Sequence, residues 1–148
     1  MYYNCTALKF VCTDEVKATI CSGMFSGCTN LLEVPTSFPN ATQCDSVFYG
    51  CTSLTNLTLS MPKATTVFSI CNGCTSLETL SLNLGTTRDS SLLIDMSQLV
   101  YGCTNIKAVD IIMNTVCDRN SNGITFNNGL MFYNCSKLVR VTGLNLAY

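Results

Sequence analysis

The chain has 148 residues, of which 47% are hydrophobic and 11% are charged, a composition that favours one folded domain over a disordered segment. Eight basic and nine acidic residues, with no run of either sign, argue against a nucleic-acid or anionic-membrane partner. No apolar run is long enough to span a membrane, and no signal peptide is visible at the N-terminus. Histidine, the commonest general base and a frequent metal ligand, is absent, so neither an enzyme nor a cofactor is expected.

A block centred on a cysteine recurs six times along the chain. In order, the copies read MYYNCTALKFV, MFSGCTNLLEV, VFYGCTSLTNL, ICNGCTSLETL, LVYGCTNIKAV and MFYNCSKLVRV. Their central cysteines are Cys5, Cys28, Cys51, Cys74, Cys103 and Cys135, separated by 23, 23, 23, 29 and 32 residues. Such a period predicts a solenoid of about six coils. It forms one domain over residues 1–148, with partial coils at both ends and inserts at about 83–98 and 112–129.

The third block indicates how each coil folds. Leu57 and Leu59 are two residues apart, the spacing of inward side chains on a strand, and the copies NLTL, ETLSL and KAVDI predict a parallel sheet. Val47 and Phe48 favour one turn of α- or 3₁₀-helix before the cysteine. Gly50 has Gly or Asn equivalents in every block, and these residues accept the left-handed conformation that closes a turn. The predicted fold class is therefore an α/β solenoid, with the sheet on one face and short helical turns or loops on the other.

The blocks MFSGCTNLLEV and VFYGCTSLTNLTLSMPKAT resemble the BspA-like leucine-rich repeats, whose units read roughly F-x-x-C-x-x-L-x-x-L-x-L. The resemblance covers essentially the whole chain. Residues 83–98 and 112–129 depart from it, and Gly143 stands where Leu59 would be, which suggests a bulge in the last strand. The resemblance implies a right-handed leucine-rich repeat solenoid. It also implies a role in protein binding or adhesion, in an extracellular, cell-surface or virion-associated setting.

The six repeat cysteines are expected to form a ladder of free thiols in the core. Equivalent residues of stacked coils point the same way, so their Cβ atoms stay about 4.8 Å apart, too far for a disulfide. Cys51 is accordingly expected to be unreactive and replaceable by alanine without loss of folding. Cys71 takes the place of Phe48 and is interpreted as an apolar substitute. Cys71-x-x-Cys74 is nominally a redox or zinc motif, but without a second pair or a histidine the packing role is favoured.

The outward positions between the inward leucines are the candidate binding face, because the open sheet of such solenoids is their usual binding surface. The centre of this face carries mainly Thr, Ser and Asn, which could hydrogen-bond a protein or glycan ligand but lack the aromatic anchors of a strong binding site. A merely solvated face is the alternative. The candidate residues are Glu33, Asn56, Thr58, Thr79, Ser81, Asp110 and Arg140.

The insert CDRNSNGITFNNG, residues 117–129, partly matches a calcium-binding loop. Asp118, Asn120 and Asn122 stand at the spacing of the first EF-hand ligands, but the twelfth position is Gly129 rather than a bidentate Glu. A polar, turn-rich loop is favoured over a calcium site.

Two functions follow from these patterns. The leading interpretation is a non-enzymatic protein-interaction or adhesion module. The alternative is a structural subunit of a phage particle or surface filament. Neither end of the sequence has a recognisable polar cap, so two explanations stay open: the chain is a piece of a longer surface protein or fibre, or it makes head-to-tail or hetero-oligomeric contacts through its ends, which is the interpretation we favour.

Overall fold

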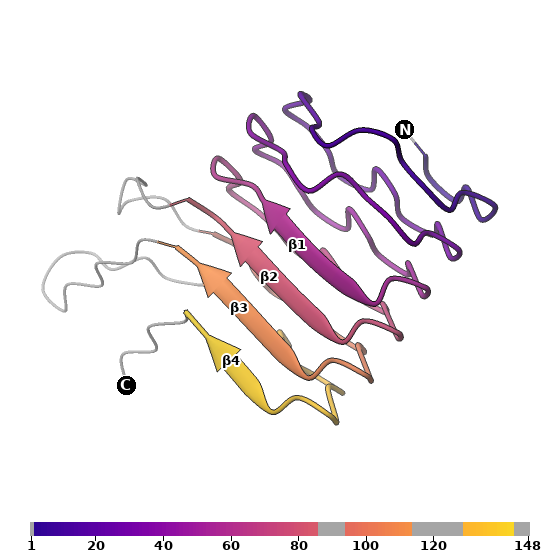
Figure 1. Ribbon diagram of the computed structural model, residues 1–148. Coiled ribbons are helices and arrows are strands. Elements are labelled where there is room, and N and C mark those ends of the chain that lie inside the picture. The colour runs from indigo at the N-terminus through magenta and orange to yellow at the C-terminus, as the bar shows by residue number, and fades with distance from the viewer. Residues whose placement is uncertain (1, 86–93, 114–128, 144–148) are drawn as a thin grey trace, which may run out of the picture.

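Four strands form a parallel sheet in the computed structural model, which describes residues 2–85, 94–113 and 129–143. They are β1 (Asn56–Ser60), β2 (Thr79–Asn83), β3 (Ala108–Ile112) and β4 (Arg140–Thr142). The order in the sheet is the order in the chain (Figure 1). Leu57 lies opposite Leu80, Leu80 opposite Val109, and Val109 opposite Val141. The parallel sheet predicted from NLTL, ETLSL and KAVDI is confirmed.

Most of the two predicted inserts lies outside the described residues. Cys117 and the three candidate calcium ligands, Asp118, Asn120 and Asn122, are among these residues.

The repeats that precede β1 pair through isolated bridges rather than strands. Phe10 pairs with Glu33, and Ser37 pairs with Ser60, both in parallel. Pro35 occupies the position of Thr58 and has no N–H to donate, which explains why no continuous strand forms there.

At the other end of the sheet, β4 keeps its register with β3 up to Thr142, opposite Asp110. Gly143 follows with a φ of 78°, and a Cβ there would collide with the carbonyl of Ile111. The described part of β4 ends at Thr142, and because the residues after Gly143 lie outside the described residues, the bulge expected there stays a prediction.

The helical turn predicted before each cysteine is the part of the fold class that the structure corrects. The described residues contain hydrogen-bonded turns in this place and no helix. The reason is that alternate amides bond in different directions. Cys51 N–H donates within its repeat to Phe48 O (3.1 Å), whereas Phe48 N–H donates to Ile70 O (2.9 Å) and Gly50 N–H to Asn72 O (2.8 Å) in the next repeat. In a helix, each of these N–H groups would donate to a carbonyl of the same segment, so no helix forms here.

Two sets of residues adopt the left-handed conformation in these turns. The Gly or Asn before each cysteine does so as predicted, with φ between 55° and 75°: Asn4, Gly27, Gly50, Gly73, Gly102 and Asn134. A second set, five residues before each of the last five repeat cysteines, has φ between 53° and 64°: Gly23, Ser46, Ser69, Gln98 and Leu130. Only the first of these is a glycine, so this set could not be recognised from residue type.

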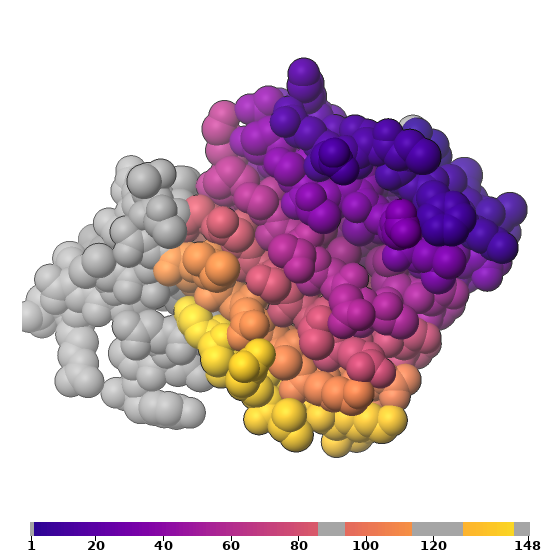
Figure 2. All heavy atoms as spheres, viewed as in Figure 1, coloured from indigo at the N-terminus to yellow at the C-terminus, as the bar shows by residue number. Residues whose placement is uncertain are grey.

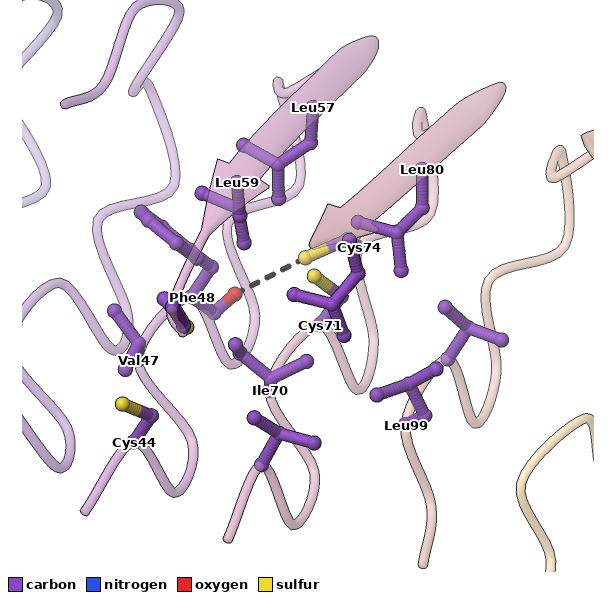
Figure 3. Close-up of a cluster of buried hydrophobic side chains, with 14 of the residues drawn as sticks. Cys44, Val47, Phe48, Leu57, Leu59, Ile70, Cys71, Cys74, Leu80 and Leu99 are labelled. Carbon is purple, nitrogen blue, oxygen red and sulfur yellow. Dashed lines mark hydrogen bonds between the residues drawn. The ribbon is translucent and has the colours of Figure 1, made fainter. Parts of the chain in front are cut away.

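The core lies between the sheet and the turns. Leu57, Leu59 and Leu80 point inward from their strands towards Phe48 and Ile70, and all are buried (Figure 3). The rings of Tyr2, Phe25 and Phe48 stack in succession with centroids 5.5 Å apart, and Phe38 meets Phe48 edge-on. Apolar side chains of successive repeats therefore form one continuous cluster.

The repeat cysteines are free thiols that bond to the neighbouring repeat. From Cys28 onward, each thiol donates to the carbonyl three residues before the preceding repeat cysteine. The pairs are Cys28 to Tyr2 (2.8 Å), Cys51 to Phe25 (3.1 Å), Cys74 to Phe48 (3.0 Å), Cys103 to Cys71 (2.9 Å) and Cys135 to Val100 (3.1 Å). We call this series the thiol ladder.

The ends of this series depart from the expectation of a uniformly buried ladder. Cys28, Cys51, Cys74 and Cys103 are buried, but Cys5 is exposed and Cys135 is half-buried. The thiol of Cys5 lies in the first described repeat, where only the following repeat packs against it.

We predict that Cys51→Ala lowers the free energy of unfolding by about 1–3 kcal/mol, because it removes a buried thiol hydrogen bond and leaves a small cavity. The expectation that alanine is tolerated without cost is thereby revised. Urea denaturation of this variant measures the loss. Cys12→Ala, at an exposed cysteine, is the control and should change stability by less than about 0.5 kcal/mol. Equal effects of the two substitutions would contradict the role of the thiol ladder.

We also predict that Ser46→Gly raises the free energy of unfolding by roughly 0.5–1 kcal/mol, because glycine removes the Cβ strain of a φ of 55°. Thermal denaturation should show a higher melting temperature. Ser53, whose φ is not positive, supplies the matched control, and Ser53→Gly should not stabilise the chain. A loss of stability in both variants would show that the Ser46 backbone is not strained.

Candidate binding face

The side chains that leave the sheet on its outer side come from alternate positions of each strand. Asn56, Thr58 and Thr79 are exposed, and Ser81 and Asp110 are half-buried. The strand register places Asn56 beside Thr79, and Thr58 beside Ser81, which lies in turn beside Asp110. These five residues, together with Arg140 and Thr142 of β4, therefore form one continuous surface, which we call the sheet face. Figure 2, drawn from the same side as Figure 1, shows successive repeats as adjoining bands of side chains.

Neighbouring side chains on the sheet face bond to one another across the strands. Thr79 Oγ1 donates to Asn56 Oδ1 at 2.7 Å. Asp110 accepts the hydroxyl of Thr142 and lies 3.4 Å from Arg140 Nη2. These contacts fix the directions of the side chains while leaving Asn56, Thr79 and Arg140 exposed to a ligand.

Charge is distributed unevenly over this side of the sheet. Glu78 and Lys107, which precede β2 and β3, form an exposed ion pair at 2.8 Å. The Lys107 hydrogen bond holds the pKa of the Glu78 carboxyl below its ordinary value. Such exposed pairs add little to stability because water and salt screen them. The β1–β2 half of the sheet face is uncharged, while Asp110 and Arg140 give the β3–β4 half its charge.

Glu33 is the one candidate binding residue that does not lie in a strand of the described sheet. It is exposed and lies beside Phe10 in an isolated bridge. The side chain of Phe10 is 52% exposed, so an apolar group adjoins the polar sheet face at this end.

The other exposed aromatic side chains lie mainly on the turns, a feature that the sequence analysis missed. Tyr49 and Tyr133 are about half exposed, and Phe68 is 36% exposed. Tyr101 stacks on Tyr133 with ring centroids 4.9 Å apart. The sequence did indicate these tyrosines, because tyrosine stands two residues before the cysteine in four of the six blocks: MYYNC, VFYGC, LVYGC and MFYNC.

The buried thiols are poorly suited to nucleophilic chemistry. Burial raises the pKa of Cys51 and of Cys103 well above the ordinary value, so little thiolate exists at neutral pH.

Within the described ranges, no group of three or more His, Cys, Asp or Glu side chains could hold a metal ion. The described part of the chain also contains no helix that is long and apolar enough to cross a membrane.

Comparisons with protein-family models, with curated proteins and with solved structures find no match to this chain. The functional interpretation therefore depends on the geometry of the sheet face and on the resemblance of the repeats.

Proposed function

We propose that the chain is a right-handed leucine-rich repeat solenoid that acts as a non-enzymatic protein-interaction or adhesion module. The solenoid architecture is supported by bonds between residues one repeat apart. Thr42 and Thr65 each donate both an N–H and a hydroxyl group to the threonine carbonyl 23 residues earlier. The extracellular, cell-surface or virion-associated setting is supported by the BspA-like resemblance.

The observation that carries the binding role is the continuous polar surface formed by the in-register outward residues of β1, β2 and β3. Asn56, Thr58 and Thr79 are short side chains, so a partner can approach the sheet closely. Hydroxyl and amide groups both donate and accept hydrogen bonds, which suits a protein backbone or a glycan. Because the strands hold these groups in place, binding costs little ordering entropy.

Thr58→Arg tests this role, because a long charged side chain in the centre of the sheet face would obstruct a ligand. Thr75→Arg is the matched control, since Thr75 is also exposed but lies outside the strands. Binding of the purified chain to an immobilised panel of glycans and secreted proteins is measured for both variants. We expect Thr58→Arg to weaken binding roughly tenfold or more and Thr75→Arg to preserve it. Equal binding by the two variants would overturn the sheet face as the site.

The alternative function, a structural subunit of a phage particle or filament, is favoured by one specific observation. Val139 is 85% exposed beside β4, and Val141 within β4 is 36% exposed. Among the described strands, β4 pairs only with β3. An apolar strand edge of this kind can accept a strand from another protein.

Val139→Asp separates the two functions. If assembly uses this edge, the substitution should reduce association roughly tenfold or more in analytical ultracentrifugation, because it places a charge in the contact. Ile112→Asp replaces a similarly apolar, exposed residue on β3 and should leave association unchanged. A chain that remains monomeric at high concentration would exclude self-assembly through β4, while its binding to the panel would still report on the sheet face.

A further inference from the structure

The fourth block, ICNGCTSLETL, differs from the other five in having cysteine at two core positions. Cys74 belongs to the thiol ladder, and Cys71 stands where Phe25 and Phe48 stand in earlier repeats. Both cysteines are fully buried. Figure 3 shows their sulfur atoms close together, to one side of Leu80.

The backbone holds these two cysteines at a separation suited to a disulfide. Cys74 N–H donates to Cys71 O at 3.1 Å, which closes a four-residue turn. The Cα atoms at the ends of such a turn are less than about 7 Å apart, and disulfides span about 4.4–6.8 Å. The neighbouring Cys74 thiol, followed by burial, raises the pKa of Cys71.

The contact between these thiols is different from the contacts along the thiol ladder. There, each sulfur points to a carbonyl: Cys74 Sγ donates to Phe48 O at 3.0 Å, and Cys103 Sγ to Cys71 O at 2.9 Å. Stacking brings ladder neighbours close, but their sulfur atoms are directed at oxygen atoms. The sulfur of Cys71 instead lies near that of Cys74 of the same turn.

We propose that Cys71 and Cys74 form an intramolecular disulfide when the chain folds or opens in the presence of a small disulfide oxidant, and that the repeat then buries this bond. Oxidised glutathione is one such oxidant. One cysteine thiolate attacks a glutathione sulfur, the S–S bond of glutathione breaks, and a glutathione thiolate leaves. The second cysteine thiolate attacks the mixed disulfide and expels the other glutathione. The two cysteines together lose two protons and two electrons, and the oxidant becomes two thiols.

Oxidation changes the thiol ladder at one place. Cys74 loses the hydrogen that it donates to Phe48 O, but that carbonyl keeps the N–H of Cys51 at 3.1 Å. The bond from Cys103 to Cys71 O uses neither oxidised sulfur and remains. The fold therefore accommodates either redox state. Because both sulfur atoms are buried, the folded chain exchanges between the states slowly.

The test is to refold the full chain from denaturant in glutathione buffers of increasing oxidised fraction, and then to label free thiols in denaturant with N-ethylmaleimide. Cleavage after Lys63 and Arg88 gives one peptide that contains both cysteines. In oxidising buffer this peptide should lose the mass of two hydrogen atoms and take no label, while Cys28 and Cys51 remain labelled. In the folded oxidised chain, reduction by dithiothreitol should be roughly tenfold or more slower than in urea.

Two variants control this experiment. Cys71→Phe restores the side chain of Phe48 at this position, and Cys71→Ala is the smaller replacement if the ring does not fit. In either variant Cys74 should be labelled or glutathionylated in every buffer, with no internal disulfide. The proposal is overturned if the wild-type peptide is fully labelled in all buffers, if it carries stable glutathione, or if Cys74 is linked to Cys51 or Cys103.

Discussion

A backbone carbonyl in each turn accepts two hydrogen bonds, and the stacking of the repeats depends on this shared acceptor. Phe25 O receives the N–H of Cys28 and the thiol of Cys51, both at 3.1 Å, and Phe48 O receives the N–H of Cys51 and the thiol of Cys74. A carbonyl has two lone pairs, so both are used in a core from which water is excluded. Cysteine suits this position because it is small and largely apolar yet carries a weak donor.

The division of amide bonds between repeats explains the rest of the architecture. Since alternate N–H groups of each turn bond to the next repeat, the segment cannot become a helix, and its chain must reverse through left-handed residues such as Ser46 and Gly50. The strands on the other side follow the same spacing and pair in register. Each repeat thus bonds mainly to its immediate neighbours, so stability is expected to accumulate repeat by repeat.

This architecture separates core chemistry from surface chemistry. The thiols that dominate the sequence pattern are turned towards carbonyl groups in the core, and the surface is left with hydroxyl and amide groups on the sheet face and tyrosines on the turns. Cys71 and Cys74 are the exception, because the two thiols lie near each other within one turn, although Cys74 also donates to Phe48 O of the preceding repeat. Binding and redox behaviour are therefore proposed for different layers of the molecule.

The repeat phase, the parallel strands and the left-handed Gly and Asn positions could all be predicted from the sequence, because they follow from local spacing and from residue type. The pairing of Leu57 with Leu80 and the positive φ of Gly50 are examples. The positive φ of Ser46 and the shared carbonyl of Phe48 emerged only in the tertiary structure. The physical reason is that these features depend on hydrogen bonds between repeats. The acceptors are brought near their donors only when the repeats stack, and most of them lie 23 or more residues away in the chain.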